Sequence, residues 1–268
     1  MCDRTDGALD ISIYPVLKLW GFTTGEYQVP TDEEIAALLP YVNYENVNVG
    51  PKDIARDDPD KEIIKDIEGK EIGFDSEYVA AFVPRMQIDL GSVAKGYTGT
   101  YVAEQLRLRG VEHALLNLGG NVQCIGTKPN GDKWKVAVKS PFEDSTSGMF
   151  GVIAADDVAI ITSGGYERYF EQDGEIYWHI LDPKTGKPAK NGLASVTVVG
   201  KDGLVCDGMS TALFVKGLDE AIKVWKESDD FEAVFITENG KVYVTEGLSA
   251  DFSLAPEYHD AELSVIYR

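Results

Sequence analysis

A helical repeat of apolar positions lies in the first half of the chain. Apolar and aromatic side chains recur three or four residues apart, at Ala94, Tyr97, Tyr101, Val102 and Leu106. This spacing predicts a helix that ends near Arg109, with Gly110 as its C-cap. Residues 89–91 therefore form a strand-to-helix junction, and glycine there lets the backbone turn or approach a ligand closely.

The chain before this helix is predicted to hold a short helix and one strand. Thr31 and Glu34 have the spacing of a capping box, so a helix is expected to start there and to stop before Pro40 or Tyr41. Residues 7–15 are interpreted as loop and extended backbone. The charged residues 51–77 are interpreted as solvent-facing strands and turns, and residues 78–83 as a buried strand.

After Gly110 the pattern changes to short apolar runs separated by turn residues. Strands are predicted at 114–118, 122–126, 133–138, 158–162 and 176–181. Asn130-Gly131 is a strong hairpin signal. The order strand, Gly-Gly and hairpin turn occurs twice, around residues 119–120 and 164–165, which suggests an internal duplication.

In the last third of the chain, segments with the apolar spacing of strands alternate with segments that have the apolar spacing of helices. Strands are predicted at 194–199, 233–237, 241–245 and 262–267, and helices at 206–215 and 219–227. Together these elements predict an α+β fold with mainly antiparallel sheets and flanking helices. The 268 residues, 44% of them hydrophobic, suffice for one large domain or two closely packed ones.

Charge narrows the classes of partner. The formal net charge is -20, which disfavours nucleic acid and anionic membrane surfaces. A phosphate site in such a chain needs a metal, a helix N-terminus or a well-placed lysine. The three cysteines are far apart and are expected to be isolated thiols, two of them near or in the core. No signal peptide or membrane-spanning stretch is expected in these residues.

Two segments carry candidate chemistry for a charged ligand. Asp207 and Thr211 are four residues apart, so they share one helix face, and both are hard oxygen donors suited to magnesium. The alternative is that Asp207 only caps its helix. In the segment DLGSVAKG at 89–96, Lys95 and the helix start could hold an anion, and Asp89 could accept hydrogen bonds from a base or sugar. The alternative there is an ordinary strand-turn-helix connection.

A third candidate is His179, at the end of an aromatic-rich strand. It could act as a general base or contact phosphate, although a lone strand histidine is more often structural. The chain has no Walker loop, no G-x-G-x-x-G, no G-x-S-x-G and no H-E-x-x-H motif. These absences argue against triphosphate hydrolysis, a Rossmann dehydrogenase and an α/β-hydrolase.

Taken together, these segments resemble the ApbE family of FAD:protein FMN transferases. Five blocks match in order: GALD at 7–10 with LWGF at 19–22, DLGSVAKG at 89–96, NLGG at 117–120, TSG at 162–164 with HILDPKTG at 179–186, and LASV at 193–196 with DGMSTA at 207–212. One block alone is weak, but their common order over most of the chain is highly specific.

The resemblance implies a T-fold-like architecture, FAD as donor substrate and Mg²⁺ as cofactor. By residue, Asp207, Thr211 and the main-chain carbonyl of Ser92 resemble the family's metal ligands. The family's flavin-nucleotide contacts are resembled by Ala8, Leu9, Asp10, Asp89, Lys95 and Leu181. His179 resembles a histidine proposed to assist the chemistry, although Trp178 beside it departs from the small residue often found there.

The implied reaction moves FMN from FAD to a threonine or serine hydroxyl of an acceptor protein and releases AMP. The expected acceptor is a flavoprotein subunit or an FMN-binding domain of a redox complex. Two alternatives stay open: a metal-dependent FAD pyrophosphatase that gives FMN and AMP, and a non-catalytic FAD-binding protein. Residues 1–268 are expected to form one ApbE-like domain without the family's N-terminal segment. An extracytoplasmic location, where relatives are often lipoproteins at a membrane, is expected from the resemblance alone.

Overall fold

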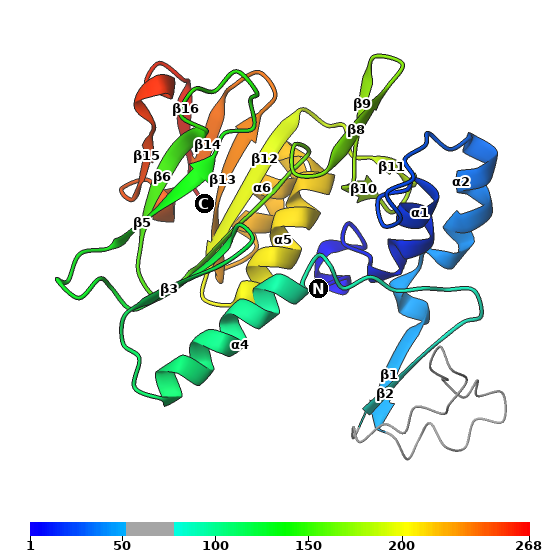
Figure 1. Cartoon of the computed structure of the whole chain (residues 1–268), viewed down its shortest axis with the longest axis horizontal. Coiled ribbons are helices and arrows are strands. Elements are labelled where there is room, and N and C mark those ends of the chain that lie inside the picture. The colour runs from blue at the N-terminus through cyan, green and yellow to red at the C-terminus, as the bar shows by residue number, and fades with distance from the viewer. Residues whose placement is uncertain (52–77) are drawn as a thin grey trace.

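The computed structural model describes residues 1–51 and 78–268, and its centre is a seven-stranded sheet (Figure 1). The strand order is β16-β14-β13-β12-β7-β4-β3. The strands are β3 (Ala114–Leu118), β4 (Asn121–Ile125), β7 (Ala159–Gly164), β12 (Leu193–Gly200), β13 (Phe231–Thr237), β14 (Val242–Thr245) and β16 (Leu263–Ile266). All neighbours pair antiparallel except β14 and β16, so the prediction of a mainly antiparallel α+β fold is confirmed.

Each face of this sheet is covered by a different layer. Three helices cover one face: α4 (Ala94–Leu108), α5 (Gly203–Lys216) and α6 (Leu218–Lys226). A three-stranded sheet covers the other: β5 (Trp134–Lys139), β6 (Met149–Ala155) and β15 (Phe252–Leu254). Strand β13 is apolar on both faces of the large sheet. Ala233 and Phe235 pack against the helices, and Val234 and Ile236 pack against the three-stranded sheet. An apolar residue at every position gives a strand buried on both faces.

The N-terminal part forms a separate layer of short helices around a cluster of aromatic residues, which includes Trp20, Phe22, Phe170 and Tyr177. It contains α1 (Tyr14–Leu19) and α2 (Asp32–Leu38), the second with the predicted capping box of Thr31 and Glu34. Short 3-10 helices occur at Asp3–Thr5, Ile11–Ile13, Leu39–Tyr41, Tyr44–Asn46, Glu246–Leu248 and Pro256–Tyr258. The prediction of extended backbone at 7–15 is therefore wrong for its second half, where Pro15 supplies a helical first turn.

Three two-stranded sheets complete the described fold: β1 (Val47–Pro51) with β2 (Tyr78–Phe82), β8 (Tyr169–Gln172) with β9 (Glu175–Trp178), and β10 (Leu181–Asp182) with β11 (Lys187–Pro188). The predicted strand at 78–83 is present as β2, but the prediction that it is buried is wrong, because Phe82 is 40% exposed and Val83 is 41% exposed. The interpretation of residues 52–77 lies outside the described residues.

The two glycine-rich stretches fold differently, which removes the support for an internal duplication. Gly119-Gly120 joins β3 to β4 as an antiparallel pair in the large sheet. After Gly164-Gly165 the chain leaves that sheet and forms the β8–β9 hairpin. Asn130-Gly131 does not close a hairpin either, because β4 and β5 belong to different sheets.

Two sequence-based expectations about the whole chain can be checked in the described residues. The cysteines are free thiols, with Cys124 and Cys206 buried and Cys2 half-buried, as predicted. Among the described helices, each is too short or too polar to cross a membrane.

Candidate functional site

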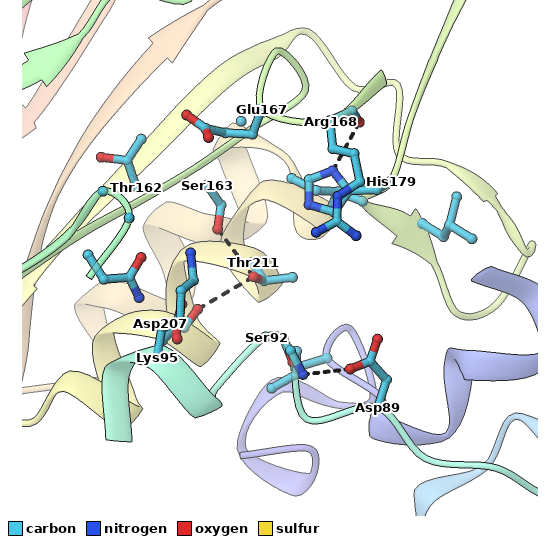
Figure 2. Close-up of a pocket in the computed structure, with 18 of the residues that line it drawn as sticks. Asp89, Ser92, Lys95, Thr162, Ser163, Glu167, Arg168, His179, Asp207 and Thr211 are labelled. Atoms are coloured by element: carbon cyan, nitrogen blue, oxygen red, sulfur yellow. Dashed lines mark hydrogen bonds between the residues drawn. The ribbon is translucent and has the colours of Figure 1, made fainter. Parts of the chain in front are cut away.

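All ten residues singled out from the sequence line one pocket of about 390 Å³ (Figure 2). They are Ala8, Leu9, Asp10, Asp89, Ser92, Lys95, His179, Leu181, Asp207 and Thr211. The walls come from the N-terminal loop, the start of α4, the β3–β4 turn, the end of β7, the segment after β9 and α5. Segments far apart in the sequence therefore converge on one cavity.

The close approach of α4 and α5 brings two of these walls together. Gly96 and Gly203 are both buried at the crossing, and a Cβ at Gly96 would collide with the main-chain oxygen of Gly203. Only glycine lets two helix backbones come this near. The contact places the start of α4, with Ser92 and Lys95, beside the turn of α5 that carries Asp207.

Asp207 is a buried carboxylate, 5% exposed, and does not cap its helix. The N-cap of α5 is Asp202, which accepts from the Leu204 N–H at 2.8 Å, so the capping interpretation of Asp207 is wrong. Asp207 Oδ2 instead accepts from the Gly96 N–H at 2.8 Å. Burial raises the pKa of Asp207, and the Gly96 hydrogen bond partly offsets this.

Thr211 lies one turn after Asp207 and points into the same cavity. Its Oγ1 is 3.2 Å from Ser163 Oγ of β7, and Ser163 Oγ is 2.8 Å from Ser210 Oγ. Figure 2 shows Thr211 between Ser163 and Asp207. A hydroxyl and a carboxylate thus lie side by side on consecutive turns, as their spacing predicted.

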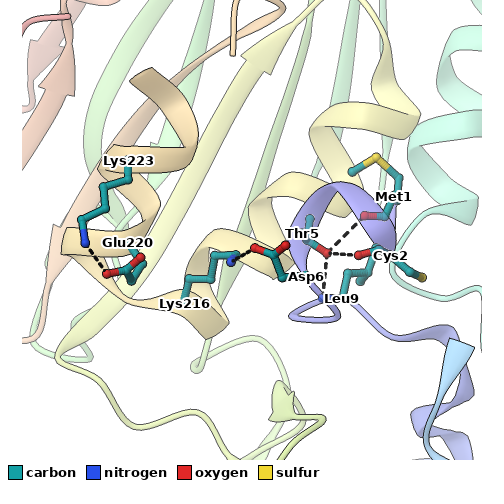
Figure 3. Close-up of polar contacts among 8 residues, drawn as sticks. All are labelled: Met1, Cys2, Thr5, Asp6, Leu9, Lys216, Glu220 and Lys223. Atoms are coloured by element: carbon teal, nitrogen blue, oxygen red, sulfur yellow. Dashed lines mark hydrogen bonds and ion pairs between the residues drawn. The ribbon is translucent and has the colours of Figure 1, made fainter. Parts of the chain in front are cut away.

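The N-terminal loop is held in place by side-chain hydrogen bonds (Figure 3). Thr5 Oγ1 donates to the main-chain oxygens of Met1 and Cys2 and accepts from the Leu9 N–H at 3.2 Å. Lys216 of α5 pairs with Asp6 at 3.1 Å. These contacts fix the backbone that presents Ala8, Leu9 and Asp10 to the pocket.

The two other carboxylates differ in how far they are free to bind a ligand. Both oxygens of Asp10 are engaged, Oδ1 by the Ser12 N–H and hydroxyl and Oδ2 by the Tyr44 N–H. Asp89 uses only Oδ1, which accepts from the Gly91 N–H at 2.6 Å. Asp89 Oδ2 has no hydrogen bond to the described residues, so Asp89 is the better acceptor for a ligand and Asp10 shapes the loop.

His179 is oriented by a main-chain carbonyl. Its Nδ1 lies 3.1 Å from the Arg168 carbonyl oxygen, which also accepts from the His179 main-chain N–H. A carbonyl can only accept, so Nδ1 carries the proton and the lone pair is on Nε2. Burial, then the positive charge of Arg168, lowers the pKa of His179 to about 4. The imidazole is therefore neutral near pH 7.

Trp178 is accommodated by a glycine on the neighbouring segment. A Cβ at Gly165 would lie 2.9 Å from the Trp178 ring, and the indole packs edge-on against Phe214 of α5, with ring centroids 6.2 Å apart. The bulky residue beside His179 thus fills space above a residue without a side chain and points into the helix layer.

Several pocket residues were missed from the sequence: Asn117, Asn121, Thr162, Ser163, Tyr166, Glu167 and Arg168. Asn117, Thr162 and Ser163 were inside matching blocks but were not assigned a role. Arg168 had no detectable signal, because only the fold places the connection between β7 and β8 beside His179.

The donors around Asp207 suit a hard divalent cation. The described residues contain no cluster of three or more His, Cys, Asp or Glu side chains arranged to hold a metal. One carboxylate with a hydroxyl and a main-chain carbonyl matches Mg²⁺, which keeps waters and substrate phosphates as its other ligands. A cation there would also neutralise a buried carboxylate. Asp207, Thr211 and the Ser92 carbonyl are the groups that would hold it.

Comparisons with known proteins identify the family of this chain. The ApbE family model matches residues 1–235. The FAD:protein FMN transferase of Klebsiella pneumoniae is 33% identical over 92% of this chain and 69% of its own length. That of Vibrio cholerae is 33% identical over 82% of this chain and 59% of its own. The chain thus spans about 59–69% of these curated relatives.

Solved structures give the same result for the fold. The ApbE protein of Thermotoga maritima superposes with a TM-score of 0.75 at 32% identity, covering 93% of this chain and 74% of that one. The flavin transferase ApbE from Vibrio cholerae superposes with a TM-score of 0.73 at 29% identity, covering 93% and 72%. The family model matches most of the chain and solved relatives share its fold, so the chain belongs to the ApbE family.

Proposed function

We propose that this protein transfers FMN from FAD to a threonine or serine hydroxyl of an acceptor protein, with a divalent cation and release of AMP. One observation carries the proposal: a buried carboxylate and a hydroxyl, a lysine and a neutral histidine converge on one pocket from segments far apart in the chain. Relatives at 33% identity are named FAD:protein FMN transferase. The proposed acceptor is a flavoprotein subunit or an FMN-binding domain of a redox complex.

The reaction is a displacement at the phosphorus of the FMN half of FAD. The acceptor oxygen forms a new P–O bond, the P–O bond to AMP breaks, and AMP leaves with the electron pair. The hydroxyl proton passes to His179 Nε2, the ring nitrogen that the Arg168 carbonyl leaves free. A bound Mg²⁺ would offset the negative charge that gathers on the phosphate oxygens. Lys95 contributes positive charge to the same oxygens.

The low pKa of His179 fits a base that works next to an anion. A pKa of about 4 keeps the ring neutral and ready to accept a proton at pH 7, but makes it a weak base by itself. The negative charge of a bound pyrophosphate favours the imidazolium form and raises the pKa toward the working pH. Proton acceptance is thereby coupled to occupation of the pocket.

The test is incubation with FAD, Mg²⁺ and an acceptor domain, followed by mass spectrometry of the acceptor and analysis of free nucleotides. An acceptor that carries FMN, with an equal amount of AMP, supports the proposal. Free FMN and AMP with an unmodified acceptor would make the protein a pyrophosphatase. FAD retained without AMP over hours would make it a binding protein.

A further inference from the structure

Arg168 is a cation in the pocket to which the described part of the chain supplies no carboxylate partner. Within residues 1–51 and 78–268, no carboxylate oxygen lies within 4.0 Å of its guanidinium, which makes one long hydrogen bond, 3.4 Å, to the Phe22 carbonyl. Three other arginines, Arg4, Arg107 and Arg268, are paired with acidic side chains. Arg85 and Arg109 also bond to groups other than carboxylates, the Tyr41 hydroxyl and the Gln105 carbonyl, but Arg168 is the one of these three arginines that lines the pocket.

The position of the Arg168 guanidinium in the pocket indicates that its charge interacts with an anionic ligand. Figure 2 shows its side chain alongside the His179 ring, across the pocket from Lys95. Two cations on opposite sides of a cavity repel each other, and both disfavour protonation of His179. The arrangement is unfavourable while the pocket is empty and becomes favourable when an anion lies between the two cations.

We propose that Arg168 is a substrate-binding residue whose guanidinium contacts the pyrophosphate of FAD on the His179 side, opposite Lys95. This inference rests on the proposed function, because FAD supplies the pyrophosphate. The planar guanidinium can donate two parallel hydrogen bonds to phosphate oxygens. The same residue holds His179 through its main-chain oxygen, so the contact with the phosphate also fixes the distance between phosphorus and base.

The charged groups facing His179 are Arg168 and Lys95, which lower its pKa, and Asp89, which raises it. Neutralising Arg168 is therefore expected to raise the pKa of His179. A residue that only packs in the pocket wall would not change the titration of His179.

The experiment compares Arg168→Gln and Arg168→Lys with the unchanged protein. Arg109→Gln is the matched control, because Arg109 lies at the far end of α4, outside the pocket, and its guanidinium donates to the Gln105 carbonyl at 3.4 Å. Flavin fluorescence gives the FAD dissociation constant with Mg²⁺ at low and high salt, and NMR gives the titration of His179. Melting curves without FAD check that each variant is folded.

Arg168→Gln is expected to weaken FAD binding about tenfold, to reduce its salt dependence and to raise the His179 pKa. Arg168→Lys should retain part of the affinity, and Arg109→Gln should stay within about twofold. FAD binding by Arg168→Gln equal to that of the unchanged protein, or equal loss in both Arg168 variants, would overturn the inference. FAD binding without acceptor labelling would refute the proposed transfer and leave the test of Arg168 intact.

Discussion

Replacing Asp207 separates its role in folding from its role in cation binding. The carboxylate is 5% exposed and accepts the buried Gly96 N–H. In Asp207→Asn the amide oxygen can still accept that hydrogen bond, and the desolvated charge is gone. Because burial raises the pKa of Asp207, the ionised form is less favourable in the folded than in the unfolded state near pH 7. We expect stability without metal to change by less than about 1 kcal/mol or to increase.

Asp207→Ala is the contrasting variant, because it removes the acceptor altogether. The Gly96 N–H would then be buried without a partner, which costs about 1–3 kcal/mol of folding stability. Both variants lose the proposed cation ligand. If cation binding contributes about 4 kcal/mol to the transition state, the rate of FMN transfer falls about a thousandfold in each.

Two assays check these expectations. In-gel flavin fluorescence of the denatured acceptor gives the transfer rate. Thermal unfolding with Mg²⁺ gives cation binding, because Mg²⁺ at a hundred times its dissociation constant adds about 2.7 kcal/mol, or about 5–10 °C, to the stability of the unchanged protein. Asp207→Asn should show no such shift. A variant with full transfer activity and the same Mg²⁺-dependent shift would refute Asp207 as a cation ligand.

Three further predictions follow from other contacts. The pKa of His179 is about 4 in the folded protein, so between pH 4 and 6.5 the unfolded state binds more protons than the folded state. Folding stability should therefore rise with pH across that window. Melting temperatures of His179→Gln measured over the same pH range should lack this rise. Gly96→Ala should lower the free energy of unfolding, measured with denaturant, by about 3 kcal/mol or more, because its Cβ would collide with Gly203. Gly99→Ala is the control and should be neutral or stabilising, because the nearest neighbour of its Cβ lies at 3.7 Å. Equal losses in both variants would refute the argument that the two helices touch through Gly96. Gly165→Ala should be destabilising alone and tolerated with Trp178→Ala, and additive effects in a double-mutant cycle would contradict their packing.

The sequence was most informative where local rules decide structure. The capping box of Thr31 and Glu34, the end of α4 near Gly110 and the strands β13 and β14 follow from residue types a few positions apart. Strand partners that lie far along the chain follow no such rule. The similar stretches around Gly119 and Gly164 therefore predicted a duplication that the hydrogen-bonded pairs do not support.

In the candidate site, too, local spacing could be predicted from the sequence and contacts between distant segments could not. Asp207 and Thr211 were found because their spacing places both on one helix face. The start of α5 was predicted three residues late, which hid Asp202 as the true cap and made Asp207 look like a helix-start residue. The role of Arg168 depends on its carbonyl and guanidinium lying beside His179, which no pattern of residue types encodes.

The glycine crossing of α4 and α5 also bears on how this protein could be re-engineered. Backbone contact through Gly96 sets the spacing between Lys95 and Asp207, so altering neighbouring side chains cannot widen or narrow the gap. A library aimed at bulkier donors or other cations would find little room for change on this side of the pocket. The N-terminal loop and the strand end that carries His179 are separate segments, and variation there could enlarge the cavity while the two helices keep their geometry.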